Sequence, residues 1–142
     1  NVSAGIGRGQ LMHLDEHRKR KKEIYERYRE GLKEIPVKMS PYPENCEPNF
    51  WLSCMTIEGK LAQSGKVTPE KIRKTLEEKN VESRPIWKPM HLQPVYRDRD
   101  FVSVDGGDVG GDIFFRGLCL PSDIKMTEET QDKVMEIIRG CF

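Results

Sequence analysis

The segment from Ser83 to His91 concentrates side chains that recognise ligands, in the order Ser-Arg-Pro-Ile-Trp-Lys-Pro-Met-His. The Arg84 guanidinium can bind a phosphate or carboxylate with paired hydrogen bonds, and Trp87 can stack on a flat or apolar group. Lys88 adds an ammonium, and His91 can donate or accept a hydrogen bond near neutral pH. Two prolines restrict the backbone, which lowers the entropy lost on binding. The residues alone leave two readings open: a binding segment, or a packed loop around a buried tryptophan.

A second pattern, His13-Leu-Asp-Glu16-His17, has the spacing of an inverted zinc-peptidase motif. Both imidazoles would lie on one helical face and bind zinc, with Glu16 as general base. A zinc site needs a third protein ligand, and the sequence offers no compelling one. Histidine and glutamate are also common on charged helix faces. We therefore favour a solvated helix face and predict no metal site.

The charge balance argues against nucleic acid and membrane partners. The 142 residues include 24 Lys and Arg against 23 Asp and Glu, for a net charge of +1. The basic run from Arg18 to Lys22 is flanked by acidic residues at helical spacing, which predicts a solvated, neutralised face. No apolar run reaches the roughly 18 residues of a membrane span. We expect no nucleic acid and no membrane as partners.

The cysteines have wide, irregular spacings and no C-x-x-C motif. They are Cys46, Cys54, Cys119 and Cys141. This usage disfavours a metal cluster or a disulfide scaffold and suits a reducing cytosol. Two of the four lie in apolar runs, where a cysteine usually acts as a small buried hydrophobe. We expect structural cysteines in a cytoplasmic protein.

Hydrophobic periodicity, caps and breakers predict the elements that position these side chains. The expected elements are a helix from Ala4 to Ile35, a buried strand from Asn49 to Ile57, a loop from Gly59 to Gly65, a helix from Pro69 to Lys79, a short edge strand from Val81 to Ile86, a helical turn from Asp112 to Arg116, a strand from Leu118 to Leu120, and a helix capped by Thr127. The second helix has Thr68 as its cap and should bury Ile72 and Leu76. The pattern predicts one domain over residues 1–142, an α+β fold with a small, about three-stranded, mainly antiparallel sheet packed by helices.

Three segments occur in a specific order: Asn1–Leu11, Ser83–Pro94, and Gly117–Ser122 followed by a threonine-capped helix. Together they resemble the C-terminal part of the DegT/DnrJ/EryC1/StrS family, the pyridoxal-phosphate-dependent sugar aminotransferases. The resemblance covers essentially the whole chain. The middle segment is similar to members that aminate nucleotide-linked 4-keto-6-deoxy sugars, as in bacillosamine or perosamine synthesis.

The resemblance implies the C-terminal small domain of a fold-type I aminotransferase, whose N-terminal cofactor-binding domain is absent from these residues. It implies a homodimer with shared active sites, acting on a nucleotide-linked ketosugar and an amino-acid amino donor in cell-surface glycan biosynthesis. Asn1 matches a loop that reaches the neighbouring subunit's cofactor site. Arg84, Trp87, Lys88 and His91 match the substrate-binding side of the pocket.

No lysine here has the surrounding motif of the Schiff-base lysine in that family. We therefore expect this chain alone to bind no pyridoxal phosphate, to carry no catalytic residue and to be inactive. The N-terminus lacks an initiator methionine, which indicates a piece of a longer protein. The glycine-rich stretch Asp105–Gly111 suggests a mobile insertion without an assigned function. The alternative reading is a non-catalytic α+β module that binds a phosphorylated ligand or a protein partner through Arg84, Trp87 and Lys88.

Overall fold

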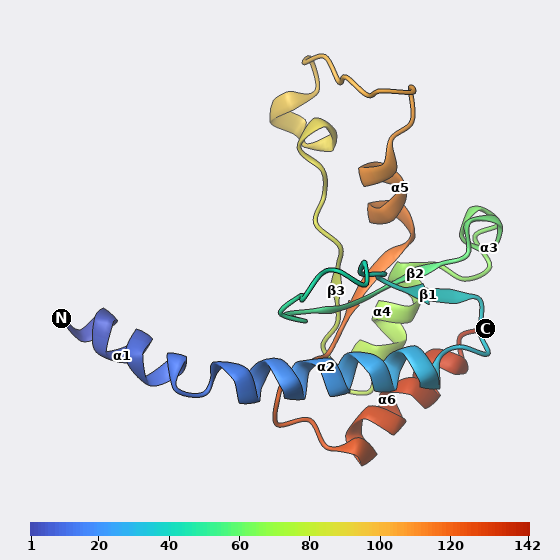
Figure 1. Ribbon diagram of the computed structural model, residues 1–142. Helices are drawn as coiled ribbons and strands as arrows, with labels where there is room; N and C mark the ends of the chain where they lie inside the picture. The colour runs from blue at the N-terminus through green and yellow to red at the C-terminus, as the bar shows by residue number, and fades with distance from the viewer.

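The computed structural model describes residues 1–142 as a four-stranded antiparallel sheet packed by helices (Figure 1). The strands are β1 (Val37–Met39), β2 (Ser53–Ile57), β3 (Arg84–Pro85) and β4 (Gly117–Leu120). The helices are α1 (Val2–Leu11), α2 (Leu14–Gly31), α3 (Gly59–Gln63), α4 (Pro69–Glu77), α5 (Val109–Arg116) and α6 (Glu128–Arg139), with two 3-10 turns, η1 (Met90–Leu92) and η2 (Pro94–Tyr96). The α+β class and the antiparallel sheet are confirmed.

The sheet has the order β1-β2-β4-β3, and every neighbouring pair is antiparallel. The predicted edge position of β3 is correct, because Pro85 has no N–H to give to a further strand. The expected count of three strands was too low. The missed strand β1 has only three residues after Pro36, too few to show an alternating pattern.

The core lies between the sheet and helices α2, α4 and α6 (Figure 1). The predicted inward residues Ile72 and Leu76 of α4 are fully buried there. The Thr68 hydroxyl accepts a hydrogen bond from the Lys71 N–H at 3.2 Å, which confirms the predicted cap. Tyr28 of α2 is also completely buried. Helix α2 packs against β1 and β2, whereas α4 packs against β3 and β4 and contacts α6.

The predicted single helix from Ala4 to Ile35 is wrong, because the chain turns at Met12 and His13 and forms two helices. Helix α1 has no buried residue and extends away from the rest of the fold (Figure 1). The predicted loop from Gly59 to Gly65 instead contains the short helix α3. No helix here is both long enough and apolar enough to span a membrane.

The strand predicted from Asn49 begins only at Ser53. Phe50 adopts a left-handed conformation with φ 51°, and the Asn49 side chain accepts a hydrogen bond from the Trp51 N–H at 3.0 Å. This turn interrupts the extended backbone and leaves Trp51 outside the strand. The strand predicted from Val81 to Ile86 likewise pairs only at Arg84 and Pro85.

Residues 87–116 form an arm that projects from the sheet and contains η1, η2 and α5 (Figure 1). The helical turn predicted at Asp112–Arg116 is longer, because the Asp108 carboxylate accepts a hydrogen bond from the Gly111 N–H at 2.7 Å and starts α5 at Val109. The arm begins directly after β3 and returns into β4. It therefore carries Lys88 and His91 of the Ser83–His91 segment away from the sheet.

A candidate ligand-binding groove at the sheet edge

A groove of about 750 Å³ lies along β3. Its walls come from residues 80–85 and Trp87, from the end of β4 and the segment that follows it, from α6, and from Lys21 and Trp51. Charged groups of both signs lie beside apolar side chains on these walls. A concave site with an apolar lining and a few polar groups is the usual form of a small-molecule site.

Two tryptophans stand together at this groove. The ring centroids of Trp51 and Trp87 are 5.8 Å apart, with the ring planes at 44°. The two residues are 64% and 62% exposed, so most of their indole surface is free. The predicted alternative of a buried Trp87 is therefore wrong. Exposed indoles of this kind can stack on a flat or apolar ligand group.

Arg84 brings a cation to the same groove. Its Nε donates to Glu82 Oε1 at 2.9 Å, and the side chain is otherwise exposed. A guanidinium has five N–H donors, so this pair leaves donors for an anionic ligand. The neighbouring Ser83 Oγ is buried and has no hydrogen-bond partner. Of the two, the exposed Arg84 offers hydrogen bonds suited to a phosphate or a polar sugar group.

Lys21 supports the groove wall. Its Nζ donates to the main-chain carbonyls of Trp51, at 3.2 Å, and of Ser122. Arg20 similarly donates from Nε to the Ile124 carbonyl at 3.4 Å. The prediction that the basic run is a solvated face is therefore wrong for these two residues. They join α2 to the segment that leads into α6.

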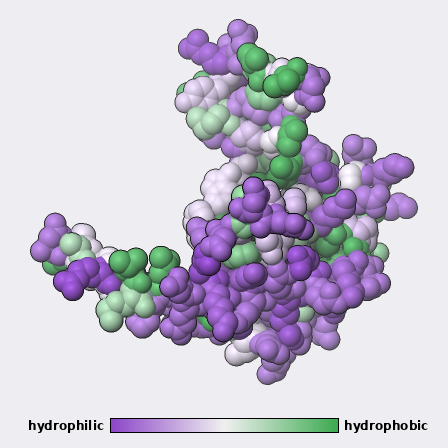
Figure 2. Space-filling view, in the orientation of Figure 1, coloured by the Kyte–Doolittle hydropathy of each residue, from purple (hydrophilic) through white to green (hydrophobic).

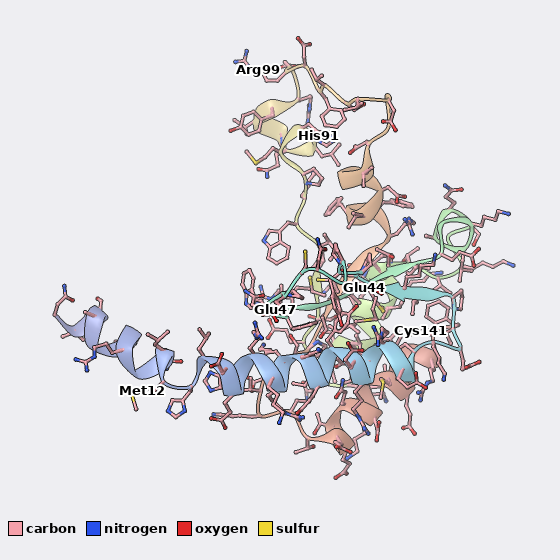
Figure 3. The ribbon with its side chains drawn as sticks, viewed as in Figure 1. Met12, Glu44, Glu47, His91, Arg99 and Cys141 are labelled. Atoms are coloured by element: carbon pink, nitrogen blue, oxygen red, sulfur yellow. The ribbon has the colours of Figure 1, made fainter.

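Lys88 and His91 lie outside the groove, on the arm. Lys88 is exposed near the base of the arm. His91 Nε2 lies 2.8 Å from Asp108 Oδ2, and its ring stacks on Phe101 with centroids 3.9 Å apart. Figure 3 shows His91 within the arm, away from the sheet. The structure thus brings Arg84 and Trp87 together and separates them from His91.

The carboxylate of Asp108 is a structural centre of the arm. The Gly111 N–H, and after it the His91 side chain, hold the pKa of Asp108 below its usual range. Both favour the ionised carboxylate by hydrogen bonding to it. The contact between His91 and Asp108 therefore joins η1 to the start of α5, because the same carboxylate caps α5.

Asn1 lies at the far end of α1 (Figure 1). Its Oδ1 accepts a hydrogen bond from the Ser3 N–H at 3.1 Å and caps that helix. The residue is exposed and contributes nothing to the groove. The candidate cofactor contact and the candidate substrate contacts are thus far apart within this chain.

The zinc-like motif does not converge on a metal position. His13 Nδ1 lies 3.4 Å from Glu16 Oε2, and the rings of His13 and His17 stack at a centroid distance of 5.9 Å. No group of three or more His, Cys, Asp or Glu side chains is arranged to hold a metal ion. The motif therefore occupies an exposed helix face.

Sequence reasoning missed Trp51 and Lys21, yet each had a signal. The pair Pro48-Asn49 favours a turn before Trp51, which should have placed the start of the predicted strand after Trp51. Lys21 lies three, four and seven residues before Ile24, Tyr25 and Tyr28, and so on the inward face of α2. Such a lysine reaches main-chain oxygens at the edge of the core.

Pyridoxal phosphate, which the resemblance implies, requires a lysine amine free to form a Schiff base. Every lysine except Lys21 is exposed, and the Lys21 ammonium donates to two main-chain carbonyls. None therefore offers a free amine in an enclosed pocket. The residues of this chain do not fit the cofactor by themselves.

Sequence comparison places these observations in a family. The model of the DegT/DnrJ/EryC1/StrS aminotransferase family matches residues 1–139. A Bacillus subtilis (strain 168) protein named as a pyridoxal phosphate-dependent aminotransferase, EpsN, is 38% identical over 100% of this chain and 36% of its own length. GDP-perosamine synthase of Vibrio cholerae is 25% identical over 100% of this chain and 37% of its own length. The chain thus spans little more than a third of these curated relatives.

The fold has matching solved structures. A DegT DnrJ EryC1 StrS aminotransferase from Brucella abortus aligns with a TM-score of 0.76 and 26% identity, over 93% of this chain and 33% of that protein. The aminotransferase TlmJ from Streptoalloteichus hindustanus has the same fold, with a TM-score of 0.78 over 99% of this chain and 35% of that protein. With the family match over residues 1–139, these findings show that the chain belongs to the DegT/DnrJ/EryC1/StrS aminotransferase family.

Proposed function

We propose that this chain is the C-terminal domain of a pyridoxal-phosphate-dependent aminotransferase that transfers an amino group to a nucleotide-linked 4-keto-6-deoxy sugar. Family membership and the relatives named GDP-perosamine synthase support this proposal. The observation that carries it is the groove, where Arg84 and Trp87 of the Ser83–His91 segment lie together. A cation beside exposed indoles suits a ligand with both phosphates and flat rings.

Each candidate residue has a role in this proposal. Arg84 binds a phosphate oxygen of the nucleotide, and Trp87 stacks on a ring of the substrate. Lys88 adds positive charge at the base of the arm. His91 keeps Nδ1 for a substrate hydroxyl, because its Nε2 is paired with Asp108. Binding and orientation of the sugar nucleotide are the contributions of this domain.

The cofactor chemistry belongs to residues outside this chain in the proposed enzyme. Relatives are nearly three times as long, which leaves room for a cofactor-binding domain. We propose a homodimer in which Asn1 lies near the neighbouring subunit's cofactor. The 142-residue chain alone is then inactive and binds no pyridoxal phosphate.

The experiment is a steady-state assay of the full-length protein with glutamate and a panel of nucleotide-linked ketosugars. Arg84→Ala should raise KM for the sugar nucleotide by roughly tenfold to a hundredfold, the cost of losing a hydrogen bond to a charged group. The control is Arg29→Ala. Arg29 is also an exposed arginine paired with a nearby glutamate, Glu26, but it lies on α2 and outside the groove. It should leave KM unchanged.

Equal KM values in Arg84→Ala and the control would reject the assigned role of Arg84. No amino transfer to any member of the panel would reject the substrate class. The non-catalytic alternative predicts a different result, in which the 142-residue chain itself binds a nucleoside diphosphate and loses that binding in Trp87→Ala and Lys88→Ala.

A further inference from the structure

Two cysteines face each other across the centre of the sheet. Cys54 of β2 lies directly opposite Cys119 of β4, and the two Sγ atoms are 3.6 Å apart. Both thiols are free. The proposed aminotransferase activity uses neither of them.

The strand register makes this pair suitable for a covalent bond. The Cys54 carbonyl accepts a hydrogen bond from the Ser40 N–H at 2.8 Å, on the side of β1, and so points away from β4. Cys54 and Cys119 are therefore a non-hydrogen-bonded pair, the type in which Cα atoms are about 4.5 Å apart and side chains approach closely. That spacing lies within the disulfide range of about 4.4–6.8 Å. Side-chain rotation can bring the sulfurs together without separating the strands.

We propose that Cys54 and Cys119 form a thiol-oxidation site that closes reversibly to a disulfide in the folded protein, with glutathione disulfide as the class of oxidant. Cys119 also lines the groove along β3, but the oxidation of the pair does not require the proposed aminotransferase function. It forms a covalent tie between two neighbouring strands whose main chains are already aligned.

The reaction begins at Cys54, which is half-buried, whereas Cys119 is only 4% exposed. The Cys54 thiolate attacks one sulfur of glutathione disulfide and releases one glutathione thiolate. Cys119 then loses its proton and attacks the Cys54 sulfur of the mixed disulfide, which releases the second glutathione thiolate. The two thiols lose two electrons and two protons, and two molecules of glutathione form.

The environment of the pair favours this order. A hydrogen bond from the Cys119 thiol lowers the pKa of Cys54 from its ordinary value, because it stabilises the thiolate. The pKa of Cys119 is raised by the same pairing and by burial. Cys54 is thus the first sulfur to ionise and to meet the oxidant, and Cys119 is the sulfur that resolves the intermediate.

The other two cysteines are internal controls. Cys46 is exposed, and the Cys141 thiol donates to the Ile137 carbonyl at 3.4 Å. Neither has a second sulfur beside it, so oxidised glutathione can add to them but the resulting mixed disulfide has no neighbouring thiol to displace it.

The experiment compares the wild-type chain with the double variant Cys46→Ser/Cys141→Ser, each incubated with glutathione disulfide and analysed by peptide mass spectrometry. The double variant should lose two hydrogen atoms in mass, carry no glutathione, contain a Cys54–Cys119 linkage and regain both thiols with dithiothreitol. Cys119→Ser should instead retain glutathione on Cys54.

A wild-type sample oxidised in concentrated urea is the control for the folded structure. It should lose the preference for the Cys54–Cys119 disulfide over the Cys46–Cys54 disulfide, because the shorter loop closes more easily in an unfolded chain.

Circular dichroism of the reduced double variant verifies its fold before oxidation. Two results would overturn the proposal: both thiols remaining free while Cys46 of the wild type is modified, or Cys54 retaining glutathione although Cys119 is present.

Discussion

Single buried polar groups connect α2 to the segment after β4 and α6 to α2. Tyr28 is fully buried, and its hydroxyl donates to the Pro121 carbonyl at 3.0 Å. Gln131 of α6 is 1% exposed, and its Nε2 donates to the Ile24 carbonyl at 2.7 Å. The Tyr28 hydroxyl supplies a donor to the carbonyl of Pro121, a residue that lines the groove, whereas Gln131 adds a second donor to a carbonyl inside α2. The wall therefore depends on polar contacts as well as on apolar packing.

Tyr28→Phe should lower the free energy of unfolding by about 1–2 kcal/mol, because the Pro121 carbonyl loses its donor while the ring remains packed. Burial also raises the pKa of Tyr28 above the ordinary value of 10.0. The unfolded chain ionises first as pH rises, so this contribution to stability is complete below about pH 10 and declines above it. Urea denaturation from pH 7 to pH 11 measures both effects.

The control for that series is Tyr96→Phe. Tyr96 lies on the arm and is 39% exposed. Its replacement should change stability by less than about 0.5 kcal/mol at neutral pH. Identical unfolding curves for Tyr28→Phe and Tyr96→Phe would show that the Tyr28 hydroxyl contributes nothing.

Helices with strong local signals could be predicted, whereas conformations set by neighbouring segments could not. Thr68 and Pro69 mark the start of α4, and the structure confirms that boundary. The left-handed conformation of Phe50 has no signal in its own residue type, and it moved Trp51 out of the predicted strand. A neighbouring segment also determines why His91 lies apart from Arg84 and Trp87, although all three belong to the Ser83–His91 segment. His91 pairs with Asp108, a contact between residues distant in the sequence that no periodicity indicates.

The junction between α5 and β4 is an element-scale test of the arm. A Cβ added at Gly117 would lie 2.5 Å from the Ile113 main-chain oxygen and would also overlap the Ile86 side chain. Gly117→Ala should therefore displace α5 or cost about 1–3 kcal/mol in stability, as expected of overpacking. Urea denaturation and the amide NMR shifts of the arm measure the two outcomes.

Gly5→Ala is the matched control, because no atom lies within 4 Å of a Cβ at that position. It should leave the core unchanged and stabilise the helical state of α1 by about 1 kcal/mol. Wild-type stability and unshifted arm resonances in Gly117→Ala would contradict the tight junction.

At the scale of the whole molecule, hydrophobic side chains gather on α1 and on the arm, while the surface over α2 is hydrophilic (Figure 2). The exposed apolar residues of these two regions include Val2, Ile6, Leu11, Met90, Val95, Val102, Val104, Val109 and Phe115. Exposed apolar surface on this scale usually marks an interface. The chain covers only 36% of the relative EpsN. We expect these regions to contact the cofactor-binding domain or the second subunit in the proposed enzyme.

We propose that the groove along β3 holds the nucleotide-linked sugar in the assembled enzyme. A crystal structure of the full-length protein with a nucleotide-linked amino sugar tests it most directly. We expect a phosphate oxygen within hydrogen-bonding distance of the Arg84 guanidinium and a ring of the ligand stacked on Trp87. A ligand bound in the same crystal without contact to either residue would contradict it.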